Sequence, residues 1–408
     1  MSHKRGWLLA AGLSAIAALA SAGAPYTPRD DQQIVETLRQ PRLPGMASLR
    51  ELRARWLTQP TLVPAALAYA RAALELSRRE EDPRYLGYAQ AALAHWWDRA
   101  KAPPEVVLVR ASLRLARMEY PAAELDLQSL IASDVPEGAA ARVTRAGLRL
   151  SQGDPVAAGT DCAAAAPHVG PLTAATCLAA VRGLRGDPHG GLAALDAALP
   201  DSANAAWGTE LWARGVAAEL ALRIGNPALA RQHFDAGVRR MHAADSTDPA
   251  LLAAFADFLL EQGQTATVRA LLADYPRHDS LLLRLTLAEQ ADGRAGDTSA
   301  AASAIERTRQ LALRFSEMRQ RADRSHLRDE ALFELEVRGD PAAALSRMTE
   351  SWTFLRDPVD ARLLLRAARA AAQPGAATVV TAWIGSTGVR DRRLDAERAA
   401  WQPPLPVR

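Results

Sequence analysis

A short turn motif recurs along this chain and limits what it can fold into. The sequence QGDPVAA occupies 152–158, Gly-Asp-Pro returns at 186–188 and 339–341, and Gly-Asn-Pro stands at 225–227. Glycine ends a helix because it adopts the left-handed conformation. Asp or Asn then caps the free N–H groups of the next helix, and proline fits the first helical position. The motif therefore predicts two helices joined with almost no linker.

The spacing of these turns predicts a repeat. Weaker copies occur at Gly263-Gln264 and Gly296-Asp297, so the glycines stand at 153, 186, 225, 263, 296 and 339. Their separations of about 33 to 43 residues are typical of stacked helical hairpins. Asp82-Pro83 and the stretch 118–121 hold the equivalent place earlier in the chain. We expect about eight hairpins between Leu62 and Pro358.

A small, a large and a small residue follow each turn, at offsets of five, nine and twelve from the glycine. The sets are Ala158, Cys162 and Ala165; Gly191, Leu195 and Ala198; Ala230, Phe234 and Gly237; and Ala344 with Met348. These offsets make one helical face. In this pattern the chain resembles the tetratricopeptide repeat family, although the Trp, Leu-Gly and Tyr positions of that family's first helix are mostly absent. The resemblance implies an all-α fold, a right-handed α-solenoid of helix-turn-helix repeats. Another helical-hairpin array of similar period is the alternative.

The ends of the chain fall outside the repeat. Residues 1–22 resemble a secretory signal: Lys4 and Arg5 precede an apolar run of about 14 residues, too short for the roughly 20 that span a bilayer, and small residues follow. We expect cleavage after Ala22 and a periplasmic or secreted protein; a transmembrane anchor is the alternative. No cysteine follows to carry a lipid. Residues 23–61 are an N-terminal extension or cap, 62–358 the repeat array, and 359–408 capping helices with a proline-rich tail.

The chain holds two cysteines, Cys162 and Cys177. An even number of cysteines in an exported chain favours a disulfide. Two small buried thiols among alanine-rich helices are the alternative.

Composition and motifs predict no chemistry. The net charge of +3 over 408 residues gives no electrostatic footprint for nucleic acid. The sequence has no glycine-rich phosphate loop, no Gly-x-Ser-x-Gly and no His-Glu-x-x-His. His326 and Glu330 lie one helical turn apart, but two ligands do not make a metal site. We therefore expect no catalytic residue, no cofactor and no metal.

Aromatic and arginine residues are the candidate partner contacts. Tyr, Trp and Arg dominate protein recognition, and they gather between 84 and 114. The candidates are Arg84, Tyr85, Tyr88, Trp97, Arg110 and Arg114. A well-packed first hairpin is the alternative for the aromatic cluster. Trp207, Trp212 and Trp352 are expected in the core.

These patterns predict a non-catalytic scaffold of the periplasm or envelope. A helical array presents a concave surface, and the resemblance implies a peptide or protein partner held there. The arginine-rich first helices favour acidic segments, unless neighbouring acids balance them. A structural subunit of an envelope complex and, less favoured, a hydrolase acting on the cell wall are the alternatives.

Overall fold

The computed structural model describes residues 30, 33, 45–99, 101–200 and 205–401. Contacts divide the chain into two compact units, residues 1–46 and 47–408. The predicted signal segment and its cleavage point at Ala22 lie outside the described residues, as does most of the stretch 23–44. In the part of the chain that is described, no helix is both long and apolar enough to cross a bilayer.

The described residues form helices and no strand. The first half contains α1 (Met46–Thr58), α2 (Val63–Glu80), α3 (Arg84–Ala92), α4 (Pro104–Ala116), α5 (Tyr120–Ala132), α6 (Glu137–Ser151), α7 (Pro155–Ala165), α8 (Pro171–Leu184), α9 (Pro188–Ala198) and α10 (Trp207–Arg223). The second half contains α11 (Pro227–Ala243), α12 (Pro249–Glu261), α13 (Thr265–Leu272), α14 (Asp279–Arg294), α15 (Thr298–Gln320), α16 (Leu327–Leu332) with a π-helical turn at Phe333–Arg338, α17 (Pro341–Ser351), α18 (Pro358–Ala370), α19 (Thr378–Thr387) and α20 (Arg392–Ala399).

The recurring turns do what the motif predicts. Each of the six glycines has a positive φ, between 67° and 110°. The Asp154 side chain accepts a hydrogen bond from the N–H of Ala157 at 3.0 Å, and Asp187, Asn226 and Asp340 cap α9, α11 and α17 in the same way. Proline opens the helix after each of these caps. Earlier in the chain Glu81 and Met118 take the left-handed conformation without a glycine, at φ of 49° and 59°.

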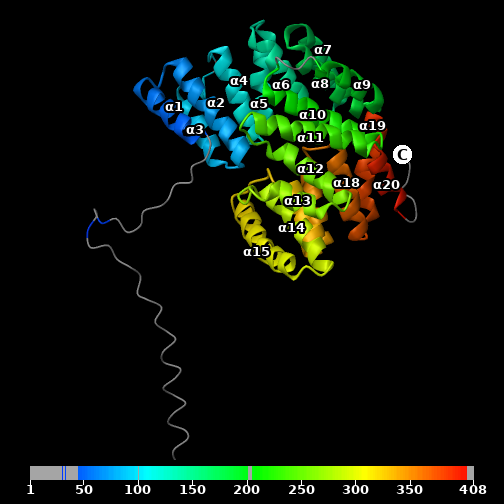
Figure 1. Cartoon of the computed structure of the whole chain (residues 1–408). Helices are drawn as coiled ribbons and strands as arrows, with labels where there is room; N and C mark the ends of the chain where they lie inside the picture. The colour runs from blue at the N-terminus through cyan, green and yellow to red at the C-terminus, as the bar shows by residue number, and fades with distance from the viewer. Residues whose placement is uncertain (1–29, 31–32, 34–44, 100, 201–204, 402–408) are drawn as a thin grey trace, which may run out of the picture. The chain divides into compact units, whose positions relative to one another are not determined.

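Consecutive helices pair and the pairs stack (Figure 1). From α2 to α17 they make eight hairpins, so the predicted all-α solenoid of about eight repeats is confirmed. The small-large-small positions are the packing face: Ala158, Cys162 and Phe234 are at most 2% exposed. The largest apolar cluster runs from α8 to α14, where the Phe234 ring stacks on Phe255 with centroids 5.1 Å apart. Each such buried ring contributes on the order of 1.5–3 kcal/mol.

The first hairpin also touches helices far along the chain. Its α2 end meets α12 and the start of α14 through three polar contacts, which we call the seam. In the first contact of the seam, the Arg78 guanidinium donates to the Asp248 carboxylate at 2.8 Å. In the second, His278 Nε2 lies 2.7 Å from the Arg79 carbonyl oxygen. In the third, the Ser280 N–H donates to the Glu81 carboxylate at 3.2 Å. Polar contacts hold the first hairpin to α12 and α14 here, whereas apolar clusters join successive hairpins elsewhere.

The last two helices, α19 and α20, reach back to three earlier turns; we call them the brace. A Cβ built on Gly153 would lie 2.5 Å from Trp383 Nε1, one on Gly186 would overlap the Gly388 carbonyl oxygen, and one on Gly225 would lie 2.6 Å from Arg392 Cδ. The glycines thus serve close approach as well as a positive φ. Residues 378–387, within the stretch expected to hold capping helices, are helical. The red α20 lies beside α18 and contacts both α18 and α10 (Figure 1).

Candidate binding hollow

A hollow of about 1680 Å³ lies inside the array. Its lining comes mainly from the first helices of seven of the eight hairpins, namely α2, α6, α8, α10, α12, α14 and α16, together with α18, Ser351 of α17 and Arg393 of the brace. On α14 the lining positions are 280, 284, 287, 291 and 294, which share one helical face. The first helices of all eight hairpins except α4 therefore contribute to the hollow.

Charged side chains in the hollow neutralise one another. Nine arginines and nine acidic residues line it. The three acids of α12 each bond an arginine of a different helix: Asp248 bonds Arg78 at 2.8 Å, Asp257 bonds Arg284 at 2.9 Å and Glu261 bonds Arg362 at 2.8 Å. Glu219 bonds Arg393 at 2.5 Å in the same way. The pairs tie neighbouring walls together and leave no net charge in the lining.

Arg284 is the most deeply buried of these arginines, at 5% exposed. Burial by itself lowers the pKa of its guanidinium, but Asp257 and Asp329 more than offset this, so the pKa is raised and the group stays charged. Asp329 is half-buried, which raises the pKa of its carboxyl, but Arg284 more than offsets this and holds that pKa below the usual value. The three groups form a fixed ionic bridge between α12, α14 and α16.

Two carboxylates share one arginine where α18 begins. Asp357 caps α18 by accepting from the Asp360 N–H at 2.9 Å, and the Asp360 side chain returns a bond to the Asp357 backbone. Arg328 of α16 bonds Asp357 and Asp360, each at 2.6 Å. Burial, with the neighbouring Asp357 carboxylate, raises the pKa of Asp360 to about 6, whereas Arg328 lowers the pKa of Asp357. One proton shared by this pair relieves the repulsion of two carboxylates around a single cation.

One apolar part of the hollow lies on α10 and α12, besides the leucines that α8, α14, α16 and α18 contribute. We call it the anchor wall, and it consists of Gly208, Trp212, Gly215 and Val216 of α10 with Ala250 and Ala254 of α12. Trp212 is 36% exposed, and of the exposed large apolar residues in the described chain it alone lines the hollow. This corrects the expectation that Trp212 is core, because its side chain is partly exposed to the hollow, whereas Ala213 at the next position is fully buried. Trp207 is half-buried with the Arg78 guanidinium 5.8 Å above its ring, and Trp352 is buried.

The predicted aromatic patch is divided between core and surface. Tyr85 is 6% exposed, which corrects its proposed role as a contact, whereas Tyr88 is 47% exposed. Arg84 is exposed and bonds Asp82 at 2.5 Å. The Trp97 ring is half-buried, with the Arg114 guanidinium 5.3 Å from its centroid. Arg84 and Tyr88 remain accessible; none of these side chains lines the hollow.

Arg110 and Arg114 belong to a buried clamp within the second hairpin. The Arg110 guanidinium bonds Asp126 of α5 at 2.6 Å, and Arg114 bonds the other oxygen of the same carboxylate at 2.7 Å. Arg110 also donates to the Trp96 carbonyl oxygen at 2.8 Å. Arg110 is 6% exposed, so it is not a partner contact, because its charge is already satisfied inside the chain.

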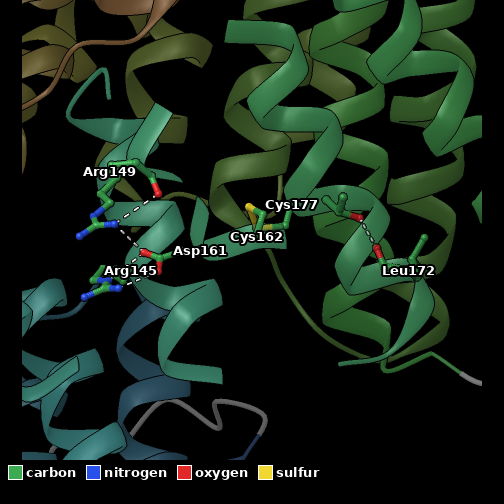
Figure 2. The surroundings of a disulfide bond; sticks show 8 residues. Arg145, Arg149, Asp161, Cys162, Leu172 and Cys177 are labelled. Carbon is green, nitrogen blue, oxygen red and sulfur yellow. Dashed lines mark hydrogen bonds and ion pairs between the residues drawn. A yellow bond between two sulfur atoms is a disulfide. The ribbon is translucent and has the colours of Figure 1, made fainter. Parts of the chain in front are cut away.

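The next hairpin repeats this clamp. Arg145 and Arg149 of α6 bond Asp161 of α7 at 2.7 and 2.9 Å (Figure 2). In both hairpins the first arginine and the aspartate are 16 residues apart. Sequence reasoning assigned arginines of these helices to a groove and missed the aspartates that bind them. The repeated spacing was the signal that would have revealed the clamp.

Cys162 follows Asp161 and is bonded to Cys177 of α8, with Cα atoms 5.6 Å apart (Figure 2). Both cysteines are at most 1% exposed. The disulfide joins the second helix of one hairpin to the first helix of the next. It therefore fixes the stacking of two repeats.

Glu330, the acid considered beside His326 as a metal ligand, is ion-paired to arginines instead. Glu330 is buried and bonds Arg347 at 2.9 Å, and a second arginine, Arg319, also contacts it. His233 Nε2 lies 3.1 Å from Asp196, and burial lowers the His233 pKa. Within the described residues no three His, Cys, Asp or Glu side chains converge in a way that would hold a metal ion.

Comparison with known proteins shows a likeness of fold to solved structures. No protein-family model matches the sequence, and no curated protein matches it. Among solved structures, the TPR domain of P58(IPK) is similar over 80% of this chain and 96% of that one, at 15% identity and a TM-score of 0.23. The repeat architecture of the present chain rests on its own turns and helix pairs.

Proposed function

We propose that this chain is a non-catalytic scaffold that holds a peptide or a segment of a partner protein in the hollow. The observation that carries the proposal is a cavity of about 1680 Å³ lined by residues of seven first helices. Small-molecule pockets have about 300–1,000 Å³, so the hollow suits a larger ligand. Helical arrays bind through such extended inner surfaces.

Export to the periplasm or envelope is part of the proposal. Its support is the N-terminal pattern of residues 1–22 and the Cys162–Cys177 disulfide, since disulfides persist in oxidising compartments. The measurement is N-terminal sequencing of the protein recovered from a periplasmic fraction. A first residue of Gly23 supports export with cleavage after Ala22, and an intact Met1 in the cytosol refutes it.

A structural subunit of an envelope complex is the second candidate. It is favoured by large apolar side chains exposed on second helices, such as Leu125, Val156 and Leu313 at 64–69%. These residues lie on α5, α7 and α15 and do not line the hollow. Single exposed apolar residues are normal on a soluble surface, so the hollow carries more weight.

Site-specific crosslinking separates the two candidates. A photoreactive amino acid placed at Trp212 samples the hollow, and one placed at Leu313 samples the outside. Crosslinking of one stoichiometric partner from 212 alone supports the scaffold; crosslinking from 313 alone supports the subunit. Ala254→Trp fills the hollow and should abolish the crosslink from 212. The matched control is Ala164→Trp, because Ala164 is exposed on α7 outside the hollow.

A further inference from the structure

We infer that the anchor wall is the primary binding subsite and that it takes an uncharged peptide segment carrying one large apolar side chain. This inference rests on the proposed function and deepens it by naming the chemistry of the partner. Two features of the hollow carry it: the geometry of the wall and the self-neutralised charge of the lining.

The wall forms a shallow apolar seat around one indole. Gly208, Trp212 and Val216 are four residues apart and therefore lie above one another on α10. The residues around Trp212 are small, and Ala250 and Ala254 of α12 are exposed to the same hollow. The Cβ position of Gly215 lies 3.9 Å from Leu251 of α12, so the two helices are adjacent here. Small residues beside a half-exposed indole leave room for a side chain against its face.

The charges of the lining argue against an ionic partner. The acidic lining residues are bonded within the protein, most of them by arginine and Glu81 by Ser280. Arg294 is the lining arginine that has no acid partner among the described residues, and it is exposed, so a charge placed beside it would be screened by water. Anywhere else in the hollow, a charged segment would have to break one of these pairs or remain unpaired in a partly buried site, and both are costly. This reverses the expectation of acidic ligands, which was based on arginines that prove to be paired. A neutral segment fits the lining as it stands.

Apolar contact with tryptophan supplies affinity with little dependence on salt. Tryptophan is enriched among the residues that dominate binding energy, where truncation costs at least about 2 kcal/mol, or about thirtyfold in Kd. Ion pairing, by contrast, is screened between 50 and 300 mM salt. We therefore expect a Kd that depends strongly on Trp212 and weakly on salt.

The experiment uses the full chain and a phage-displayed library of random dodecapeptides. Selected peptides are synthesised with a fluorescent label, and their Kd is measured by polarisation at 50 and 300 mM NaCl. We expect peptides of net charge near zero with a recurring Phe, Leu or Trp. We also expect about thirtyfold weaker binding to Trp212→Ala and near-normal binding to Trp212→Phe. Leu313→Ala, on an outer helix, is the matched control and should change Kd by less than about twofold.

The outcomes separate this inference from the proposed function. Selection of acidic peptides, or equal binding to wild type and Trp212→Ala, overturns the anchor wall. If Ala291→Trp, which adds bulk on α14 inside the hollow but outside the anchor wall, abolishes binding in that case, the hollow remains the binding site and the proposed function stands. If no peptide binds, or if Ala291→Trp and Ala254→Trp both bind like wild type, both fall. Circular dichroism of each variant checks that the helices are intact.

Discussion

Replacing Asp126 with alanine should open the second hairpin while the rest of the array stays closed. The Asp126 carboxylate accepts from Arg110 at 2.9 and 2.6 Å and from Arg114 at 2.7 Å. Both Arg110 and Asp126 have side chains that are only 7% exposed. The substitution leaves the backbone preference of α5 intact or improved, because alanine is the better helix former. The loss of stability in Asp126→Ala therefore comes from the buried Arg110 guanidinium, which is left without its carboxylate partner.

The expected magnitude is about 3 kcal/mol. Removing one partner of a buried ion pair costs roughly 3–5 kcal/mol. The lower end applies because Arg110 keeps the carbonyl oxygens of Trp96 and Trp97 as acceptors, at 2.8 and 2.9 Å, and Arg114 is 16% exposed and can reach water. At about 1.4 kcal/mol for each factor of ten, local opening becomes roughly a hundredfold more frequent.

Native-state hydrogen exchange followed by mass spectrometry measures this opening locally. It avoids the two-state assumption, which long repeat arrays do not satisfy. Amides of α4 and α5 should exchange about a hundredfold faster in Asp126→Ala. The matched control is Glu306→Ala, which removes an exposed pair with Arg309 and should change protection by less than about 1 kcal/mol. The reasoning is refuted if the two variants behave alike, or if protection falls equally in α14–α17.

Three further perturbations test other parts of the structure. The carboxyl of Asp360 has a pKa of about 6 in the folded chain, against an ordinary value of 3.8. Between these two pH values the folded chain binds a proton at Asp360 that the unfolded chain does not, so the free energy of unfolding falls as the pH rises from 3.8 to 6. Asp360→Asn should therefore gain stability relative to wild type from pH 4 to 7 in urea melts; a difference that does not change with pH contradicts the shared proton. Reducing the Cys162–Cys177 disulfide, which encloses 15 residues, should cost about 3 kcal/mol, and equal thiol reactivity in denaturant before and after reductant would exclude the bond. The double variant Arg78→Ala, Glu81→Ala should speed amide hydrogen exchange in α2 and α3 and leave exchange in α8 and α9 unchanged. Slower or unchanged exchange in α2 would show that the seam does not stabilise the first hairpin.

The repeat was predictable because its signals are local. Gly153 ends one helix and Asp154 begins the next through contacts within a few residues, so the sequence alone indicates hairpins and their number. The clamp was also predictable from the sequence, because an arginine and an aspartate stand 16 residues apart in both hairpins. It was missed because the charges were considered one helix at a time.

The hollow was less predictable because it depends on how the hairpins accumulate. A tryptophan is usually buried, and only the rotation of α10 within the stack decides that Trp212 faces inward. The contact between Arg78 and Asp248 joins residues 170 positions apart. Such contacts depend on the small rotation between each hairpin and the next, added up over several repeats. No short segment of sequence determines that total rotation.

The brace has a consequence for how this protein can vary. An open helical array gains or loses a hairpin at little cost, because each repeat contacts only its neighbours. Here Trp383, Gly388 and Arg392 meet the turns at 153, 186 and 225, so α19 and α20 span a set number of repeats. Inserting or deleting one hairpin between those turns would put a helix end opposite the wrong glycine. The number of hairpins in this stretch is thus a property of the whole fold, and relatives that keep the last two helices should also keep the count.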